Sequence, residues 1–400
     1  MGKYKYKAMN TIGKKIDGTY NANSKDEVFS MLSANGFYPL KVEEVVESTE
    51  IEMDFLERVN TKDIAVFCRQ LYTMLDAGVT INNALNILAE QLSNKKLKKA
   101  VREIEDKVKK GESLSKAMSD YPKVFPGLLV TMVESGEVSG NLDTVMLRMC
   151  GHYEKENKIN NKIKGAMTYP IILSIVAVVV VIFLFTYIMP TFLDMFEDAG
   201  TELPGSTKFL IWMTEFVAAN GLAIGVVFTA IIVAITLYIK TEHGKYTTSR
   251  LKLMLPILKP LNEKIIVSRF SRTLSTLLAS GVSMGQALQI ISGVVGNKIA
   301  EDALIEVKEH VFKGEGLSNP IRDAKIFPLM LSTMIKIGEE TGSMDEILEK
   351  TADFYDDEVD QAITTATTMI EPLLIIVMGV VIGFIIISIM LPLFSMYTTI

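Results

Sequence analysis

Residues of the kinds that perform chemistry are few and scattered in this sequence of 400 residues. Cysteine occurs only at positions 68 and 150, and histidine only at 152, 243 and 310. No histidine shares a motif with a cysteine or an acidic pair, so the spacing indicates no catalytic triad, metal cluster or disulfide framework. No P-loop or dinucleotide-binding glycine motif occurs. We therefore expect a protein that is not an enzyme and has neither a cofactor nor a metal ion.

A Gly-Glu-x-x-Gly motif is the sharpest short feature, and it occurs twice: Gly136, Glu137 and Gly140, then Gly338, Glu339 and Gly342. We interpret it as structural. A glycine ends one helix, Ser139 or Asn141 caps the next helix, and the glutamate accepts hydrogen bonds from the free amides of the turn. The alternative is that these glutamates, together with Glu134 and Glu340, line a partner groove or hold a divalent cation.

Two arginines recur within otherwise apolar helical patterns, Arg69 and Arg272. We expect them to form internal ion pairs. The glycine that follows each of these patterns, Gly78 and Gly281, is typical of a helix C-terminus. A lysine-rich stretch at 95–99 is most simply a solvated helix face, and near a membrane it would also suit anionic lipid or an acidic partner.

The elements that carry these residues include three long apolar runs. Residues 165–193, 216–239 and 372–400 contain no charged side chain. Each run exceeds the roughly 20 residues that cross a hydrocarbon core of about 30 Å. We therefore predict three transmembrane helices and contact with the lipid bilayer. The cores of these spans hold no ionisable group, which disfavours a solute transporter, the alternative of another class.

Charges beside the spans indicate their orientation. Lysines precede the first span, and a mostly acidic loop follows it. Lysines and an arginine then follow the second span. By the positive-inside rule the N-terminus lies in the cytoplasm, the acidic loop lies outside, and counting places the C-terminus outside. The formal net charge of −6 argues against a protein that binds nucleic acid directly.

The chain contains an internal repeat. Residues 67–88 align with 270–291 at an offset of 203 with ten of 22 positions identical, where chance gives roughly one or two. Residues 132–145 align with 334–347 at an offset of 202, and the prolines that bracket the first span, Pro170 and Pro190, align with Pro372 and Pro392. The repeated unit is thus a soluble domain with the span that follows it. The second span returns the chain to the cytoplasm.

Each soluble copy has the apolar periodicity of a helical bundle. In the first copy we expect helices from Thr61 as N-cap to Gly78, from Thr80, over 95–110, from Ser113, and from Asn141 toward the membrane. The first 46 residues differ, because they suggest a hairpin with an Asp17-Gly18 turn, a helix capped by Ser24 that runs through Leu32, and a strand over 37–46.

The predicted fold class is mainly α: a polytopic membrane protein with three transmembrane helices, two repeated cytoplasmic helical bundles and a small N-terminal α+β module. The predicted segments are a ββαβ module (1–46), a linker (47–60), domain 1 (61–168), span one (169–190), an acidic outer loop (191–215), span two (216–239), a basic linker (240–262), domain 2 (263–371), span three (372–392) and an outer tail (393–400).

Together these features resemble the platform proteins of type II secretion and type IV pilus machines, the GspF/PilC family. The resemblance covers essentially the whole chain. It is carried by the N-terminal module, the paired segments FCRQLYTMLDAGVTINNAL and FSRTLSTLLASGVSMGQAL, the Gly-Glu-x-x-Gly elements, and KIKGAMTYPIILSIVAVVVVIFLFTYIMP. The last segment is the most specific, since it fits the family signature from its basic residues through Tyr169-Pro170 to Pro190.

The resemblance implies a non-enzymatic platform in the cytoplasmic (inner) membrane. A cytoplasmic hexameric secretion or pilus-assembly ATPase would dock on its soluble domains, and its motion would drive extraction of pilin or pseudopilin transmembrane helices into a filament. Other machine assembly proteins and a homo-oligomer, a dimer or higher, are further implied partners. A DNA-uptake (competence) pseudopilus is the alternative machine, because the family's platform is shared among these systems.

Overall fold

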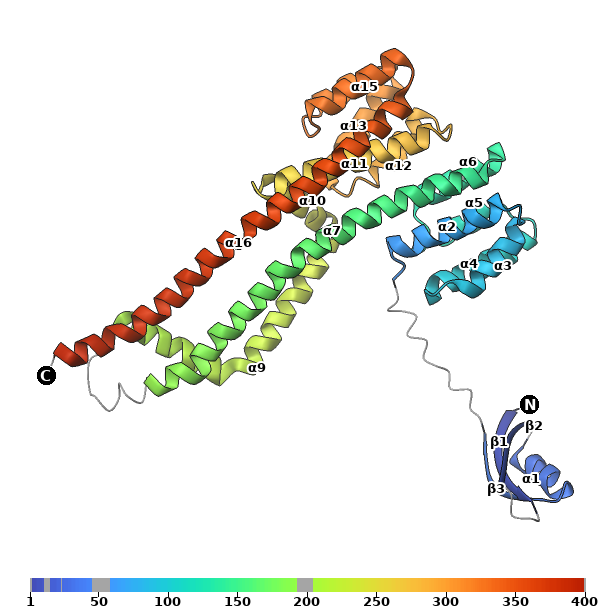
Figure 1. The fold of residues 1–400 in the computed structure, drawn as a ribbon, viewed down its shortest axis with the longest axis horizontal. Coiled ribbons are helices and arrows are strands. Elements are labelled where there is room, and N and C mark those ends of the chain that lie inside the picture. Colours follow the sequence, from blue (N-terminus) through green and yellow to red (C-terminus); the bar gives the residue numbers. More distant parts are fainter. Residues whose placement is uncertain (1, 11–14, 23, 45–57, 193–203, 399–400) are drawn as a thin grey trace. The chain divides into compact units, whose positions relative to one another are not determined.

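The computed structural model of the chain describes residues 2–10, 15–22, 24–44, 58–192 and 204–398 (Figure 1). Its contacts divide the chain into two units, Met1–Val59 with Ser93–Lys99, and Asn60–Leu92 with Ala100–Ile400. The first unit contains a small sheet with one helix, and the second is helical throughout its described elements. The predicted fold class, mainly α with a small N-terminal α+β module, is confirmed.

The N-terminal sheet has the strand order β2-β1-β3, in which β1 (Gly2–Asn10) pairs antiparallel with both β2 (Lys15–Ala22) and β3 (Phe37–Glu44). Helix α1 (Lys25–Ala34) lies between β2 and β3 in the chain. Ser24 caps it by accepting a hydrogen bond from the Glu27 amide at 3.3 Å. Val28 and Leu32 are buried against Tyr4 and Ala8 of β1 in one apolar core. The order ββαβ is therefore as predicted.

The Asp17-Gly18 pair is not the hairpin turn, and that prediction is wrong. Both residues lie within β2, where Gly18 pairs with Tyr6 of β1. A Cβ atom on Gly18 would approach the Tyr6 hydroxyl to 2.7 Å, so the tyrosine side chain lies over the glycine and would have to shift for a larger residue. The residues that join the two strands, 11–14, lie outside the described part of the chain, as do residues 45–46 of the predicted last strand.

The two sequence copies fold into two series of six helices in the same order. The first copy comprises α2 (Thr61–Asp76), α3 (Ile81–Gln91), α4 (Lys95–Lys109), α5 (Leu114–Ser119), α6 (Gly127–Ser139) and α7 (Leu142–Phe183). The second comprises α11 (Leu258–Leu278), α12 (Met284–Ser292), α13 (Lys298–Phe312), α14 (Ser318–Asp323), α15 (Leu329–Thr341) and α16 (Met344–Thr398). We refer to the parts of these series before the membrane as domain 1 and domain 2.

The same aromatic pair lies in the core of each domain. In domain 1 the rings of Phe67 and Phe125 are 5.5 Å apart, and in domain 2 the rings of Phe270 and Phe327 are 5.6 Å apart. All four side chains are buried. These positions correspond at the offsets of the sequence repeat, so the copies share their packing as well as their helix order.

Two local predictions about the domains need correction. The N-cap of α2 is Asn60 and not Thr61, because Asn60 and Asp63 form a reciprocal capping box. The predicted basic linker 240–262 is largely helical, with α10 at Glu242–Met254 and the start of α11 at Leu258. Helix α10 packs on α13, where the Ser249 hydroxyl accepts a hydrogen bond from the Lys298 amide at 3.0 Å.

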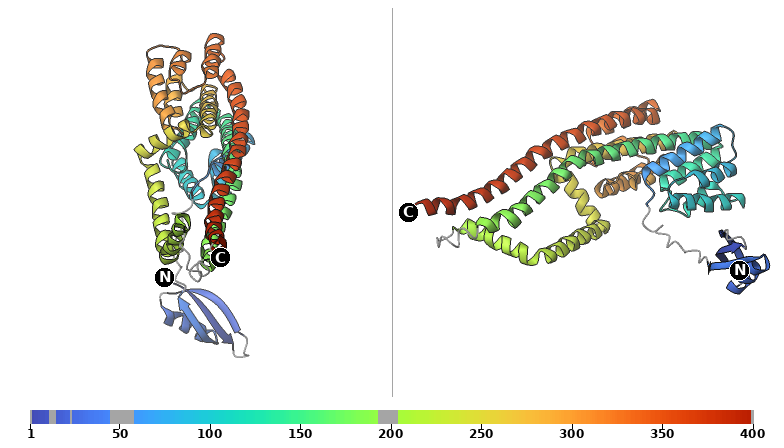
Figure 2. Two further views of the ribbon diagram at one scale, coloured as in Figure 1. Left: turned by 90° about the vertical axis from the view of Figure 1, so that its left-hand side faces the viewer. Right: turned by 60° about the horizontal axis from the view of Figure 1, so that its bottom comes forward.

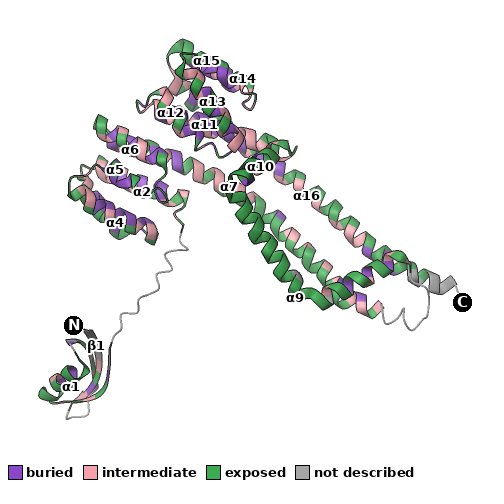
Figure 3. Ribbon diagram, turned by 180° about the vertical axis from the view of Figure 1, so that it is seen from behind, coloured by how far each residue is buried: buried purple, intermediate pink, exposed green. Residues whose placement is uncertain are grey.

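Three helices of the described chain have the length and apolar composition to cross a membrane, within Leu142–Phe192, Ala219–Lys240 and Met344–Leu391. Helix α7 reaches the membrane without a break and continues as a π-helical turn, η2 (Leu184–Ile188), just before Pro190. A proline clashes with the carbonyl of the preceding turn, and a wider turn relieves that contact. Most side chains along α9 (Gly205–Lys240) are exposed, as suits a surface that lipid covers (Figure 3).

The ends of the spans differ from the prediction in two places. The outer loop predicted over 191–215 is helical from Gly205 onward, and α9 bends at Asn220. The tail predicted from residue 393 continues α16 to Thr398. The helical extension at 205–215 contacts the other spans: its Leu210 joins Phe185, Met189, Ile385 and Ile389 in one buried apolar cluster, and its Thr207 hydroxyl donates to the Ser388 carbonyl at 2.5 Å. We call this group the outer cluster.

Helices α7 and α16 leave the two domains in the same direction and lie side by side (Figures 1 and 2). Each is one continuous helix from its domain into its span. Each helix therefore links its domain directly to its span. This connection positions the polar groups described next.

Candidate functional site

The glutamate of each Gly-Glu-x-x-Gly motif caps a short helix of its own domain. Glu137 accepts hydrogen bonds from the Leu114 and Ser115 amides of α5 at 2.5 and 3.0 Å, and from the Ser115 hydroxyl at 2.5 Å. In domain 2, Glu339 accepts from the Leu317 amide and from the Ser318 hydroxyl. The amides lie about 22 residues from the glutamate and not in the adjacent turn, which corrects the predicted local contact.

The glycines of the motif permit a close turn between two helices. Gly140 and Gly342 cap α6 and α15 in the left-handed conformation, each with a φ of 73°. A Cβ atom on Gly136 would lie 3.1 Å from the Leu142 Cα atom, and one on Gly338 would lie 3.0 Å from that of Met344. The first glycine of each motif thus lets the following helix begin against the preceding one.

Glu134 and Glu340, the other two predicted acidic residues, are exposed. Glu340 lies 3.8 Å from Lys336 one turn earlier on α15. Gly78 and Gly281 follow α2 and α11 with φ values of 80° and 78°, as the helix-stop pattern predicts. In the described ranges no group of three or more His, Cys, Asp or Glu side chains is arranged to hold a metal ion.

Arg69 and Arg272 form equivalent ion pairs in the two domains. Arg69 binds Glu154 of α7 through both carboxylate oxygens, each 2.6 Å from its Nη2 atom. Arg272 binds Asp356 of α16, the residue equivalent to Glu154, at 2.5 Å. The Arg69 side chain is 52% exposed and that of Arg272 only 11%, so only the second arginine is internal as predicted.

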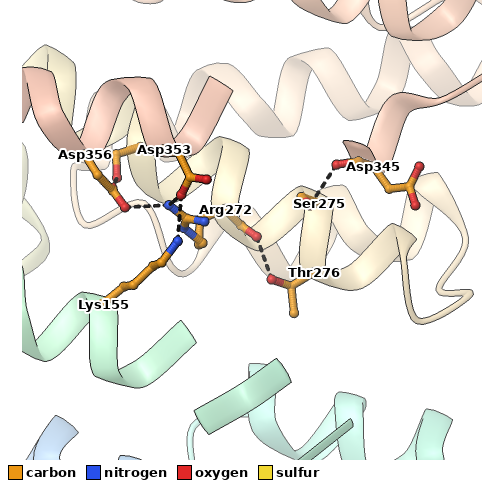
Figure 4. Close-up of polar contacts among 8 residues, drawn as sticks. Lys155, Arg272, Ser275, Thr276, Asp345, Asp353 and Asp356 are labelled. Atoms are coloured by element: carbon orange, nitrogen blue, oxygen red, sulfur yellow. Dashed lines mark hydrogen bonds and ion pairs between the residues drawn. The ribbon is translucent and has the colours of Figure 1, made fainter. Parts of the chain in front are cut away.

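The difference arises because domain 1 covers Arg272. The Arg272 guanidinium also binds Asp353 at 2.7 Å, and Asp353 forms a second ion pair with Lys155 of α7 at 2.6 Å. Figure 4 shows Lys155 reaching from α7 toward Asp353 on α16, with Arg272 between Asp353 and Asp356. Two cations from different domains therefore share one carboxylate. We call Lys155, Arg272, Asp353 and Asp356 the joint.

The joint continues toward the membrane as a ladder between α7 and α16. Lys162 pairs with Asp360, and the Tyr169 hydroxyl lies 3.3 Å from a Glu371 carboxylate oxygen. The α7 members recur every seven residues, which keeps them on one helix face. In the ladder, Lys162 and Tyr169 belong to α7, and the carboxylates of Asp360 and Glu371 belong to α16. Pro170 follows directly and is buried within α7.

A cleft of 290 Å³ lies between the two helices at this level. Its polar lining comprises Lys155, Lys158, Asp353, Asp356, Asp357 and Asp360. The interface beside it is ionic and partly exposed, whereas the outer cluster is apolar. Exposed ion pairs of this kind contribute little to stability individually.

The sequence did not predict the joint or the ladder as a unit. Lys155 and Lys162 contributed only to the membrane orientation, as part of the lysines before the first span, and the aspartates of α16 carried no prediction. A usable signal exists in the shared seven-residue spacing of Lys155 and Lys162 and of Asp353 and Asp360, with opposite charge on the two pairs. The same spacing on a single helix is also typical of a solvated face, so it does not identify the partner helix.

Comparison with known proteins agrees with this arrangement. Residues 67–190 and 270–392 each match the family described as "Type II secretion system (T2SS), protein F", and residues 1–43 match its N-terminal domain. The chain belongs to the type II secretion system protein F family. The two matched segments are the two repeats, each with its own transmembrane helix, so the predicted resemblance is confirmed.

Relatives of this protein F family member work in two kinds of machine. The chain is 39% identical over 400 residues to the type IV pilus assembly protein PilC of Thermus thermophilus, covering 99% of this chain and 98% of the relative. It is 37% identical to PilC of Myxococcus xanthus, covering 98% and 94%. It is 33% identical to type II secretion system protein F of Aeromonas hydrophila, covering 94% and 97%. The family consists of membrane platform proteins for assembly, which are generally not enzymes.

Proposed function

We propose that this protein is the non-enzymatic platform of a type IV pilus or type II secretion machine in the cytoplasmic membrane. A cytoplasmic hexameric ATPase docks on domains 1 and 2, and its motion drives pilin or pseudopilin helices out of the membrane into a filament. One observation carries the proposal: each repeat joins a soluble domain to a span through a single continuous helix, α7 or α16.

The two contacts between these helices suit a mechanical role. The ionic joint and ladder permit domain 2 to shift against domain 1, because exposed ion pairs are weak and exchangeable. The outer cluster holds the far ends of the spans together. A shift of the domains would thus change the angle between α7 and α16 around a fixed outer end. The apolar faces of the spans suit packing against a pilin helix.

The membrane orientation is part of the proposal. Domains 1 and 2 and the N-terminus lie in the cytoplasm, and the C-terminus lies outside. Cysteines placed at exposed Lys110 and exposed Phe394 test it in intact cells. A membrane-impermeant maleimide should label Phe394→Cys and not Lys110→Cys. The reverse labelling would refute the orientation and, with it, docking of a cytoplasmic ATPase.

Purification from the source cells tests the function. The detergent-solubilised protein should bring down a hexameric ATPase and a pilin or pseudopilin, identified by mass spectrometry. The pilin would also distinguish pilus, secretion and DNA-uptake machines. Recovery of other membrane complexes without either partner would refute the platform role and favour a transport component. We further propose that the platform acts as a homo-oligomer.

A further inference from the structure

The two domains meet through unlike faces. Domain 1 presents a face of α6 and α7, which includes Ser135 and His152, and domain 2 presents a face of α11. The Ser135 hydroxyl donates to the Ser280 carbonyl at 2.8 Å, and Glu156 of α7 lies 3.6 Å from Arg269. His152 is 7% exposed and lines a small cavity with Arg269 and Arg272. We call the α6–α7 face of domain 1 the plug and the α11 face of domain 2 the socket.

Because the two domains are repeats of one another, each has both a plug face and a socket face. Within one chain, only the plug of domain 1 and the socket of domain 2 are in contact. The second plug lies on α15 and α16 of domain 2, where Ile337 corresponds to Ser135 and Phe354 to His152. The second socket lies on α2 of domain 1, where Val66 and Arg69 correspond to Arg269 and Arg272, and Ala77 corresponds to Ser280.

The unused faces are exposed where their counterparts are covered. Phe354 is 44% exposed against 7% for His152, and the Arg69 side chain is 52% exposed against 11% for Arg272. Ile337 is 37% exposed and Val66 is 40% exposed. Apolar side chains on both unused faces are therefore exposed to solvent in a single chain.

The unused faces are also complementary in chemistry. In the internal contact His152 lies beside Arg269 and Arg272. In the equivalent contact Phe354 would lie beside Val66 and Arg69, which pairs an aromatic ring with an apolar side chain and a guanidinium. Asp357, equivalent to Lys155, would face Arg69 with an attractive charge. Apolar contact and an aromatic–guanidinium pair are both favourable.

We propose that a second copy of this chain docks through these faces, with its α15–α16 plug on the α2 socket of its neighbour. A contact between unlike faces generates a ring when its rotation closes. Because α7 and α16 run in the same direction, a copy added by the same contact also crosses the membrane in that direction. The domains would then alternate around the ring, domain 1 to domain 2 within a chain and domain 2 to domain 1 between chains.

This proposal names the surfaces through which the homo-oligomer would form, and it rests on the proposed function because the homo-oligomer itself is part of that function. Its experiment uses the purified full-length chain alone, without ATPase or pilin. A failure of docking between copies and a failure of the platform role are therefore distinguishable: the first appears in the purified protein, and the second appears in the partners recovered from cells.

Disulfide cross-linking between differently tagged full-length chains tests the contact. One chain carries Ala77→Cys and the other Ile337→Cys, the equivalents of the touching pair Ser280 and Ser135. Oxidation in membranes should yield a covalent species with both tags. A single chain with Ser135→Cys and Ser280→Cys is the positive control, because it should close internally without forming a dimer. The native cysteines are buried.

Leu329→Cys in place of Ile337→Cys is the matched control, since Leu329 lies on the same helix and is 69% exposed. It should give no cross-link with Ala77→Cys. Two results would overturn the proposal: closure of the internal pair with no Ala77–Ile337 species, or equal cross-linking of Leu329→Cys.

Particle mass gives a second, independent readout. The wild-type protein in nanodiscs should contain two or more chains, and Phe354→Asp should reduce the particle to one chain while Leu329→Asp leaves it unchanged. Circular dichroism checks that both variants keep their helices. A wild-type particle of one chain, or a Phe354→Asp particle that keeps its mass, would refute docking through this face.

Discussion

At the scale of residues, the carboxylates of Glu137 and Glu339 hold their domains together by satisfying helix ends. The first amides of a helix have no partner within it, and a buried amide without a partner costs free energy. Glu137 satisfies two amides of α5 and Glu339 one amide at the start of α14. Each carboxylate makes these hydrogen bonds within its own domain, so the motif acts as a clamp between two helices.

We expect Glu137→Ala to lower the free energy of unfolding of domain 1 by about 1–3 kcal/mol, because the Leu114 and Ser115 amides lose their acceptor. Urea-dependent proteolysis of the full chain measures this loss. Glu137→Gln should lose less, since its amide oxygen still accepts a hydrogen bond. Glu134→Ala, at an exposed position of the same helix, should change stability by less than about 0.5 kcal/mol. Equal effects of the two alanine variants would contradict the clamp.

The native cysteines should be inert in the folded protein. Burial raises the pKa of Cys68 well above its usual range, and nearby Cys150 raises it further. The thiolate is the reactive form, so its fraction at neutral pH is very small. Maleimide should label Cys68 only after denaturation, as mass spectrometry of tryptic peptides would report. Rapid labelling of the native protein would mean that α2 separates readily from α7.

At the scale of elements, equivalent helices carry the same ion pair in different surroundings. The Arg69 pair on α2 is exposed, whereas the Arg272 pair on α11 is covered by α7 of the other domain. Domain 2 therefore depends on its arginine more strongly than domain 1 does. The same comparison reveals the unused socket on α2.

We expect Arg272→Ala to destabilise domain 2 by about 1–3 kcal/mol, because it removes charged hydrogen bonds from Asp353 and from the mostly covered Asp356. Arg69→Ala should have a smaller effect on domain 1, because solvent screens its pair. Urea-dependent proteolysis at sites specific to each domain compares the two variants. A larger effect of Arg69→Ala would show that burial does not decide the strength of these pairs.

At the scale of the whole helical unit, α7 and α16 are joined by two contacts of opposite character. The ladder near domains 1 and 2 is ionic, and the outer cluster is apolar. Raising the salt concentration from 0.1 to 1 M shortens the Debye length from about 10 to about 3 Å, which weakens only the first contact. We therefore expect changes on the domain side, rather than at the outer cluster, to alter the angle between the two helices.

Charge reversal tests this control. Lys162→Glu should separate α7 from α16 by repulsion from Asp360, and adding Asp360→Lys should restore the contact. Spin labels at the exposed positions Asn161 and Thr364 report the interhelical distance by pulsed electron resonance. Lys164→Glu, at an exposed position on the same helix, is the control and should leave the distance unchanged. If the double variant remains as widely separated as Lys162→Glu, the pair does not hold the helices together.

Local sequence was enough to predict the three spans, the two helical domains and the order of the N-terminal module, although it missed α10 and the helical extensions of α9 and α16. Apolar length alone sets a membrane span, and hydrophobic periodicity sets the helical bundles, because both depend on residues that are neighbours in the chain. The sequence identity between residues 67–88 and 270–291 predicted two similar domains, and the aligned prolines placed one transmembrane helix after each of them. The left-handed glycines and the Ser24 cap were predictable for the same local reason.

Which of these elements touch depends on tertiary packing, which local sequence does not reveal. The partners of Glu137, Lys155 and Arg272 lie about 22, 198 and 84 residues away, and no local pattern selects among the many carboxylates and amides at such distances. The Asp17-Gly18 prediction failed because both residues pair with the neighbouring strand, where Tyr6 lies over the glycine, and a local turn pattern does not reveal that pairing. The joint exists because two copies of one domain meet through unlike faces, and that choice depends on how folded surfaces fit.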